Sequence, residues 1–365
     1  MQLNSQVCGI VIKVNDKLPK VSDIKILGRS CLQWVELSLG DSFYTSIDAD
    51  AGADVLQVCK NHTNPKSTYT VLLYSDTPLI TKRTVLQILD IAVQKNLNVL
   101  KMTRGWVFKT AHLMESDSVI APSESSFLQE EFLIADSFKQ VALITNYLKN
   151  RILDYHMKNG VHIVDPPSVF IDCEVYIGKN VTIEPNNIIK NRTEIKDNVL
   201  VSSGNVLDDV ILDSFVTVNS SNLMQCYVGK DSKIGPYARI RPESVIGCNC
   251  KIGNFVEIKN SVIGDNTKIS HHTYVGDATI GDNCNIGCGV VFCNFDGQKK
   301  HNTCVGNGAF VGANSTLIAP VSLSQNSYVA AGSTINQNVE ENSLAIARAR
   351  QQNKQGWYKM DKNNE

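Results

Sequence analysis

The side chains in this sequence that are best suited to acid–base chemistry are its histidines, above all the adjacent pair His271 and His272 in SHHTYVGD. An imidazole has an unperturbed pKa of about 6.5, so it can accept a proton near neutral pH. Considered alone, His271 is also consistent with a structural role in the wall of the fold. Because side chains alternate in direction along a strand, His272 is expected to point away from His271 and to have no catalytic role.

The cysteines offer a second chemistry, metal binding. Cys248 and Cys250 are two residues apart, and Cys284 and Cys288 are four apart. Neither pair belongs to a paired CxxC arrangement, so small buried thiols are favoured over a metal site. The first residues lack the basic start, apolar stretch and cleavage site of an export signal. We therefore expect a cytoplasmic protein with reduced thiols.

Composition limits the classes of partner. Lysines and arginines number 35 against 36 acids, a formal charge of -1, which leaves no broad basic surface for nucleic acid or anionic lipid. No apolar run approaches the roughly 18 residues that a membrane span needs. Small anionic ligands stay compatible with this balance.

The elements that position these groups follow a period of six. Aliphatic residues recur at every sixth position in three runs, which are Ile171, Ile177, Ile183, Ile189, Ile195, Val201 and Leu207, then Val228, Ile234, Ile240, Ile246, Ile252 and Ile258, then Val305, Val311, Leu317, Leu323, Val329 and Ile335. A helix repeats at about 3.6 residues and a strand at 2, so this period indicates the hexapeptide coils of a parallel β-helix.

Three hexads close a coil of about 18 residues, so residues 161–340 predict roughly ten stacked coils, left-handed as is usual for hexapeptide repeats. Ile-Gly and Val-Gly pairs recur in the repeats, where glycine suits a sharp turn. The register breaks between Phe292 and Val305, and the polar segment 294–302 (NFDGQKKHN) predicts a protruding loop.

The remaining segments predict a second domain and a connection. Residues 1–135 predict a small α/β domain, with strands in CGIVIKV, YTVLLYS and LNVLKM and a helix over 81–95. Residues 136–160 predict a helical arm, with Asp136 or Ser137 as its cap and Gly160 as its stop. Residues 341–365 predict a short helix in SLAIARARQQ and a polar tail. The fold class is α/β plus all-β.

From about His156 to Trp357 the chain resembles the left-handed β-helix half of a bacterial bifunctional family, the N-acetylglucosamine-1-phosphate uridylyltransferase and glucosamine-1-phosphate acetyltransferase. The segments that carry the resemblance are HMKNGV, IGPYARIRP, IGNFVEIKNS, HHTYVGDATIGDNCNIGCG, CNFDG, FVGANSTLIAPV, AAGSTI, ENSLAIAR and KQGW. They cover over half the chain in one unbroken order.

The resemblance implies acetyl transfer from acetyl-CoA to the amine of glucosamine 1-phosphate, a step toward UDP-N-acetylglucosamine and the cell wall, with His271 as general base. It implies that Arg241 and Lys259 bind the phosphate, whose oxygens suit a guanidinium fork. Tyr274 and Asn285 match sugar-binding residues, and Lys300 in the loop adds a third positive charge. A surface salt bridge is the alternative role for each lysine.

For coenzyme A, the resemblance implies a further set of positions, which are Cys288, Asn294, Phe295, Ala313, Ala331 and Arg348. Three depart from the commonest family residues: Cys288 replaces an alanine, Phe295 a tyrosine and Ala313 a serine. Loss of two hydroxyls predicts weaker coenzyme binding, by about tenfold if both were used. The resemblance also implies a homotrimer, with sites between neighbouring rods and with the 294–302 loop and the Trp357 tail reaching across.

The amino-terminal domain resembles the uridylyltransferase half only in CGIVI, LPKV and YSDTPLI. The family's glycine-rich phosphate loop is missing, since Ile10 to Val14 runs directly into Asn15, Asp16 and Lys17. Asp76 matches the family's magnesium-binding aspartate, Lys20 its LPKV lysine, and Asp136 lies near its second metal ligand. We expect a shortened, degenerate domain that has lost uridylyl transfer, with Mg²⁺ needed only if it is still active.

Three alternatives stay open at this point. The protein is bifunctional and retains uridylyl transfer, or it is a non-catalytic trimeric scaffold. A third alternative is a zinc hydratase of the carbonic-anhydrase type, which would use His271, His272 and His301 across a subunit boundary.

Overall fold

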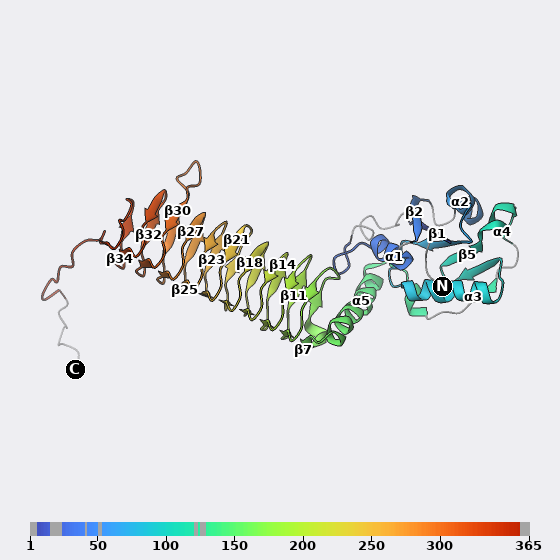
Figure 1. Ribbon diagram of the computed structural model, residues 1–365, viewed down its shortest axis with the longest axis horizontal. Coiled ribbons are helices and arrows are strands. Elements are labelled where there is room, and N and C mark those ends of the chain that lie inside the picture. Colours follow the sequence, from blue (N-terminus) through green and yellow to red (C-terminus); the bar gives the residue numbers. More distant parts are fainter. Residues whose placement is uncertain are drawn as a thin grey trace, which may run out of the picture. The chain divides into compact units, whose positions relative to one another are not determined.

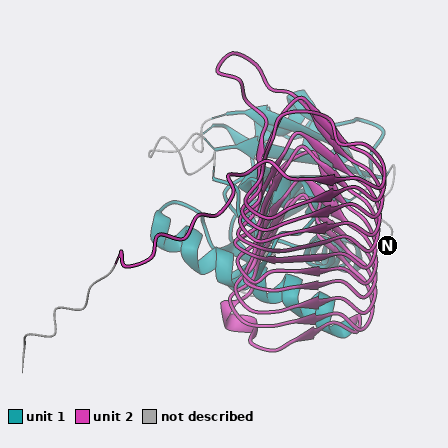
Figure 2. Cartoon of the chain, turned by 90° about the vertical axis from the view of Figure 1, so that its left-hand side faces the viewer, with its two compact units in different colours: residues 1–158, 170–174 teal, residues 159–169, 175–365 magenta. Residues whose placement is uncertain are grey.

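The computed structural model describes residues 6–14, 24–40, 42–49, 53–119, 123–124 and 129–357. The chain forms two compact units, one of residues 1–158 with 170–174 and one of residues 159–169 with 175–365 (Figure 2). We call them the amino-terminal unit and the β-helix unit. Within the described ranges, no helix combines the length and the apolar character needed to cross a membrane.

The amino-terminal unit is built on a mixed six-stranded sheet in the order β2-β1-β3-β5-β4-β6. Its strands are β1 (Val7–Lys13), β2 (Phe43–Asp48), β3 (Tyr69–Tyr74), β4 (Val99–Met102), β5 (Gly105–Lys109) and β6 (Ser123–Glu124). Its helices are α1 (Cys31–Leu39), α2 (Val55–His62), α3 (Lys82–Gln94), α4 (Thr110–Glu115), α5 (Phe138–Lys158) and the 3₁₀ turn η1 (Gln129–Phe132).

Apolar side chains on both faces of the sheet explain why its central strands are nearly continuous apolar runs. In β1, Val7 and Val11 pack in one cluster with α1 and α3, while Ile10 and Ile12 pack in a second cluster with Leu56 of α2. A strand covered on both faces has no polar side to show in its sequence. The predicted strands in CGIVIKV, YTVLLYS and LNVLKM and the predicted helix over 81–95 are confirmed as β1, β3, β4 and α3.

The helix α5 occupies the segment predicted as an arm. The Ser137 hydroxyl accepts the Gln140 N–H at 3.3 Å, so Ser137 and not Asp136 caps the helix. Val141, Ile144 and Leu148 are buried in a third cluster of the amino-terminal unit.

The β-helix unit confirms the predicted left-handed solenoid of about ten coils, whose short parallel strands stack along its length (Figure 1). We number its three walls by strand count. Sheet 1 has 11 strands: β7 (His162–Ile163), β10 (Thr182–Ile183), β13 (Leu200–Val201), β16 (Thr217–Val218), β19 (Lys233–Ile234), β22 (Lys251–Asn254), β25 (Lys268–His271), β28 (Asn285–Ile286), β31 (Phe310–Val311), β34 (Tyr328–Val329) and β36 (Leu344–Ala345).

Sheet 2 has 10 strands: β8 (Phe170–Ile171), β11 (Ile188–Lys190), β14 (Val206–Asp208), β17 (Asn222–Met224), β20 (Arg239–Ile240), β23 (Glu257–Lys259), β26 (Tyr274–Gly276), β29 (Val291–Cys293), β32 (Thr316–Ile318) and β35 (Thr334–Ile335). Sheet 3 has 9 strands: β9 (Tyr176–Ile177), β12 (Glu194–Ile195), β15 (Ile211–Leu212), β18 (Cys226–Val228), β21 (Ser244–Ile246), β24 (Val262–Ile263), β27 (Ala278–Ile280), β30 (Thr303–Val305) and β33 (Val321–Leu323). A 3₁₀ turn η2 (Pro166–Ser168) precedes β8.

Every predicted hexad residue is buried, and these residues stack on counterparts in neighbouring coils, as Ile183 does on Val201 and Val201 on Val218. A close contact between neighbouring coils explains why glycine follows isoleucine in these pairs. A Cβ on Gly264 would lie 2.4 Å from Asp282 Oδ1, the atom that accepts the Asp265 N–H at 2.8 Å. Glycine therefore leaves room for the carboxylate that ties one coil to the next.

The predicted carboxy-terminal helix over 343–352 is wrong. Leu344–Ala345 forms β36, which pairs in parallel with β34, and the Tyr328 N–H donates to the Ser343 carbonyl at 2.8 Å. The last coil would otherwise end with unpaired backbone donors, and an extended segment satisfies them where a helix would not.

Replacing Gly264 with alanine is expected to destabilise the solenoid by about 1–3 kcal/mol, because the new methyl group would overlap the Asp282 carboxylate. Thermal melting followed by circular dichroism measures the effect. Thr279→Ala, at an exposed position of β27, serves as the control and should melt close to the wild type. Equal melting of both variants would contradict the close approach.

Candidate functional site

A group of cations gathers where strands of sheet 2 end. Arg241 directly follows β20, Lys259 ends β23, and the two are neighbours in adjacent coils, since the Arg241 N–H donates to the Ile258 carbonyl. Arg241 Nη1 lies 3.0 Å from Glu257 Oε1, and Lys259 Nζ lies 3.4 Å from Asp277 Oδ1. We call Arg241, Lys259 and Lys300 the cation cluster.

Lys300 reaches this cluster from the 294–302 loop, which projects from the solenoid beside β30 (Figure 1). The close approach and positive charge of Lys259, and to a smaller extent Arg241, lower the pKa of Lys300. The neighbouring Lys300 amine and the Asp277 carboxylate raise the pKa of Lys259. Crowded cations repel one another, and a bound anion would relieve that repulsion.

His271 ends β25, at the other edge of sheet 2. Its side chain is exposed, and its Nδ1 lies 2.5 Å from Oδ1 of Asn254, which is 17 residues earlier and is its register partner in β22. An amide oxygen only accepts, so Nδ1 carries the proton. The lone pair is therefore on Nε2, which is the form of imidazole that a general base requires.

Tyr274 lies on sheet 2, between the corner that holds His271 and the corner that holds the cation cluster. It begins β26, the sheet 2 strand that follows His271, and Val275 after it points into the core. The Asn294 amide lies 3.4 Å from the Tyr274 hydroxyl, and Tyr274 is close enough to Lys259 to help raise its pKa. The side chain thus runs along the outer face of sheet 2 toward the cation cluster. Asn294, which is 7% exposed, also donates to Asp277.

The residues predicted to bind coenzyme A fall into two groups. Cys288, Ala313 and Ala331 follow successive sheet 1 strands at the corner that holds His271, as shown by the donation of the Asn314 N–H to the Cys288 carbonyl and of the Gly332 N–H to the Ala313 carbonyl. Arg348 Cδ lies 4.0 Å from the position of a Cβ on Gly332.

Asn294 and Phe295 lie at the opposite edge of sheet 2, where Phe295 pairs with Lys300 in the loop. Across the described residues of one chain, no hydrogen bond or ion pair joins this second group to the first, nor His271 to the cation cluster. Asn285 lies in sheet 1 between Lys268 and Phe310, apart from the cations, and Trp357 is 83% exposed.

The three imidazoles of the zinc alternative have different partners. His271 bonds to Asn254, His272 packs on Phe255 with ring centroids 4.8 Å apart, and His301 Nε2 lies 2.6 Å from Asp296 Oδ2. Within the described ranges, no three His, Cys, Asp or Glu side chains are grouped to hold a metal. Of the paired cysteines, Cys250 is buried, which raises its pKa to about 11.

In the amino-terminal unit, Asp76 is not arranged as a magnesium ligand. Arg104 binds both carboxylate oxygens, with Nε 2.8 Å from Oδ1 and Nη2 2.5 Å from Oδ2, and its guanidinium stacks 4.4 Å from the Tyr74 ring centroid. Asp136 is exposed, although the Ala135 N–H beside it donates to the Asp76 carbonyl. The residues therefore do not fit the metal. Lys20 and Asn15, Asp16 and Lys17 lie outside the described residues.

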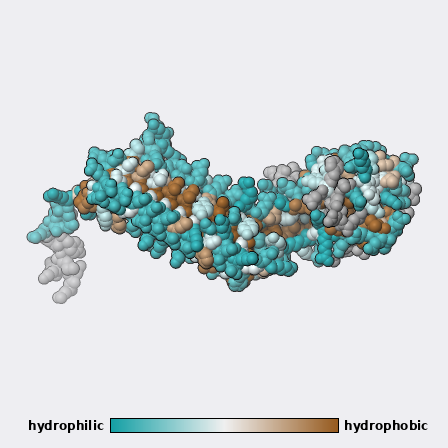
Figure 3. Space-filling view, in the orientation of Figure 1, coloured by the Kyte–Doolittle hydropathy of each residue, from teal (hydrophilic) through white to brown (hydrophobic). Residues whose placement is uncertain are grey.

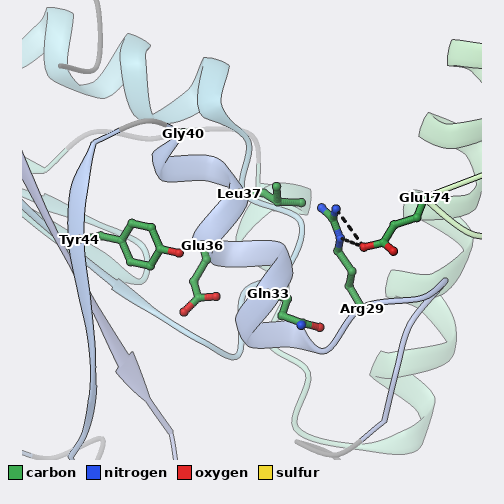
Figure 4. A pocket seen from close by; sticks show the side chains of 7 residues that line it. All are labelled: Arg29, Gln33, Glu36, Leu37, Gly40, Tyr44 and Glu174. Carbon is green, nitrogen blue, oxygen red and sulfur yellow. Dashed lines mark hydrogen bonds and ion pairs between the residues drawn. The ribbon is translucent and has the colours of Figure 1, made fainter. Parts of the chain in front are cut away.

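One pocket of about 400 Å³ opens beside α1 (Figure 4). Its lining residues are Arg29, Gln33, Glu36, Leu37, Gly40, Tyr44 and Glu174. Arg29 is already paired with Glu174 at 3.3 Å, and Glu36 accepts the Ser46 hydroxyl at 2.6 Å. None of the predicted site residues lines it.

Sequence reasoning missed Asn254 and Asp277, which orient a predicted base and a predicted cation. Both lie one coil from the residue that they contact, His271 and Lys259 respectively. The coil length was the signal that could have found them, because residues about 17 or 18 apart lie side by side in a hexapeptide solenoid.

The comparisons with known proteins support the resemblance. The chain is 48% identical over 230 residues to the bifunctional protein GlmU of Alkaliphilus oremlandii, and 46% identical over 228 residues to that of Clostridium beijerinckii. These stretches are 63% and 62% of this chain and 50% of each relative, so the chain spans about half the length of the curated relatives it matches. The similarity to GlmU proteins is confirmed. A family model, the GMPPB C-terminal domain, matches residues 222–296.

Among solved structures, an Arabidopsis UDP-N-acetylglucosamine acyltransferase aligns with a TM-score of 0.36 and 16% identity, over 50% of this chain and 70% of that one. The UDP-N-acetylglucosamine acyltransferase LpxA of Bacteroides fragilis aligns with a TM-score of 0.35 and 19% identity, over 49% and 69% of the two chains.

The hydrogen bond to Asn254 predicts a single neutral tautomer of His271, protonated at Nδ1. Nitrogen-15 NMR of histidine-labelled protein above pH 8 should show an unprotonated Nε2. Asn254→Ala should shift the ring toward the Nε2-protonated form that a free histidine side chain prefers. The resonances of His301, which is bonded to Asp296, provide the internal control. An Nε2–H proton in the wild type would contradict the assignment.

Proposed function

We propose that this protein transfers the acetyl group of acetyl-CoA to the amine of glucosamine 1-phosphate, giving N-acetylglucosamine 1-phosphate for UDP-N-acetylglucosamine and cell-wall synthesis. One observation carries the proposal. His271 with a free Nε2 and the cation cluster flank the same outer face of sheet 2, and Tyr274 lies between them. In glucosamine 1-phosphate the amine on C2 and the phosphate on C1 are on neighbouring carbons, so His271 and the long cationic side chains would converge over this face on one small acceptor.

In the proposed reaction, the cation cluster holds the phosphate and Tyr274 contacts the sugar, with Asn285 as the second sugar residue. The amine nitrogen attacks the thioester carbonyl carbon, and His271 Nε2 accepts the proton that the nitrogen loses. The tetrahedral intermediate then breaks its C–S bond and releases coenzyme A, whose thiolate takes the proton from His271. The acetyl group moves directly, so no covalent enzyme intermediate is needed.

The coenzyme would run along the corner that holds His271. Cys288, Ala313 and Ala331 present small side chains in successive coils, about 4.8 Å apart, and Arg348 lies beside the last of them. A guanidinium at that end suits the phosphates of acetyl-CoA. Asn294 and Phe295, on the other edge of sheet 2, complete the proposed coenzyme set.

In one chain the proposed coenzyme residues lie at two opposite edges of sheet 2. A homotrimer would bring them together, because a neighbouring copy can place its Asn294 edge of sheet 2 against the His271 corner. An aromatic column supports packing there: Tyr237 and Phe255, 60% and 53% exposed, stack with centroids 5.6 Å apart, and Phe255 contacts His272. All three have positive φ, a strained conformation for bulky residues that costs about 1–3 kcal/mol each. Hydrophobic surface along the solenoid is visible in Figure 3.

Replacing His271 with alanine is expected to lower kcat by about 10²- to 10⁴-fold, since general base catalysis contributes that much. Thiol release from acetyl-CoA, measured with glucosamine 1-phosphate as acceptor, gives the rate, and the melting curve should not change. His272→Ala is the matched control and should retain most of the rate. If wild type and His271→Ala were equally inert while both bound the coenzyme, the scaffold alternative would be correct.

We further propose that the amino-terminal unit has lost uridylyl transfer, because Arg104 occupies both oxygens of Asp76. Incubation with UTP, Mg²⁺ and N-acetylglucosamine 1-phosphate should then release no pyrophosphate. Arg104→Ala, which frees the carboxylate, tests whether the ion pair alone blocks the reaction. Pyrophosphate release by the wild type that Asp76→Asn abolishes would instead establish the bifunctional alternative.

A further inference from the structure

Asp277 is a carboxylate that the proposed reaction does not use, yet it lies between the two proposed substrate sites. It follows β26 and is 9% exposed. Its Oδ1 accepts from the Asn260 amide at 2.7 Å and lies 3.4 Å from Lys259 Nζ, while its Oδ2 accepts from the Asn294 amide. One buried carboxylate thus holds a residue of the phosphate clamp and a residue of the coenzyme set.

The backbone around Asp277 is shaped for these contacts. A Cβ on Gly276 would lie 2.4 Å from the Tyr274 hydroxyl and 2.6 Å from the Asn294 amide nitrogen, so only glycine lets the two side chains meet. The Thr303 N–H, directly after the loop that carries Lys300, donates to the Asp277 carbonyl at 3.2 Å. The carboxy-terminal end of the loop is therefore hydrogen-bonded to Asp277.

The solenoid itself does not require a carboxylate at this corner. Asp277 has a φ of 50°. In earlier coils the same corner between sheets 2 and 3 is turned by Asn191, Asp209, Gln225, Glu243 and Asn260, all with positive φ, and three of these five are amides. Asparagine is therefore compatible with the fold here. Burial alone would raise the pKa of Asp277, but hydrogen bonds from Asn260 and Asn294 and the charge of Lys259 lower it, so the group is an anion at neutral pH.

We propose that Asp277 is a positioning residue that fixes Lys259 and Asn294 together, so that the acceptor site and the coenzyme site are ordered as one unit. The proposal rests on the proposed function for the identity of the two substrates. The contacts explain the need for a carboxylate, because three donors converge on two oxygens and an asparagine offers only one acceptor. In Asp277→Asn, one side must lose its hydrogen bond and face a donor instead.

Steady-state kinetics distinguish a residue that positions both substrate sites from one that affects a single site. Lys259→Ala is expected to raise KM for glucosamine 1-phosphate alone, and Asn294→Ala to raise KM for acetyl-CoA alone. Asp277→Asn keeps one acceptor oxygen and should raise one of the two constants by about tenfold, the effect of about one charged hydrogen bond. Asp277→Gly, which keeps neither oxygen and suits the positive φ, should raise both. Asp282→Asn is the matched control, because Asn307 already performs the same turn-capping role in the next coil. A change in only one KM in Asp277→Gly would overturn the proposal.

A second measurement needs no substrate and so distinguishes failure of this proposal from failure of the proposed function. The amine of Lys259 faces Lys300, Asp277 and Tyr274, and the carboxylate helps to keep its pKa above the ordinary value. Asp277→Asn should therefore increase acetylation of Lys259 by an N-hydroxysuccinimide ester at pH 8 several-fold, as read by mass spectrometry. Unchanged labelling, with or without acetyltransferase activity, would show that Asp277 does not position Lys259.

Discussion

The structure depends on one constraint, the stacking of an inward aliphatic side chain on the equivalent side chain of the next coil. Ile240 on Ile258 and Ile258 on Val275 are two such steps. Each step fixes the rise at about one strand spacing, near 4.8 Å, and leaves no freedom of register. Residues that are 17 or 18 apart in sequence are thereby held side by side on the outside of the solenoid.

The candidate site is assembled from such outside columns. Asn254 meets His271 at one corner of sheet 2, and Lys259 meets Asp277 at the other. A strand of only three residues separates the two corners, about 10 Å of backbone at roughly 3.3 Å per residue. The rigid wall therefore sets the spacing between His271 and the cation cluster, in which Lys300 comes from the 294–302 loop and not from the coils.

Much of this organisation could be predicted from the sequence, because a strict period of six has few structural solutions. The buried hexads, the loop and the strands β1, β3 and β4 follow directly from residue patterns. The edge strand β2 was missed because FYTSID shows no apolar run, and it pairs with β1 alone. The carboxy-terminal helix was wrongly predicted because local composition does not reveal the unpaired backbone edge of the last coil.

The site was less accessible to sequence reasoning. The resemblance supplied His271, Arg241 and Lys259. The roles of Asn254 and Asp277 could not be predicted, because each depends on a contact with a residue one coil away. The Arg104–Asp76 pair is another long-range contact, 28 residues apart, and no sequence motif predicts it. Such partners depend on register and on which neighbour fills the available hydrogen bonds, and both are properties of the folded chain.

We propose that His271 and the cation cluster act on the amine and the phosphate of one acceptor. A crystal structure of the protein with glucosamine 1-phosphate and coenzyme A tests it most directly. We expect the acceptor amine within hydrogen-bonding distance, about 3 Å, of His271 Nε2, with the phosphate on Arg241, Lys259 and Lys300. A phosphate bound away from these cations, or an amine beyond the reach of His271 in every copy of the assembly, would contradict it.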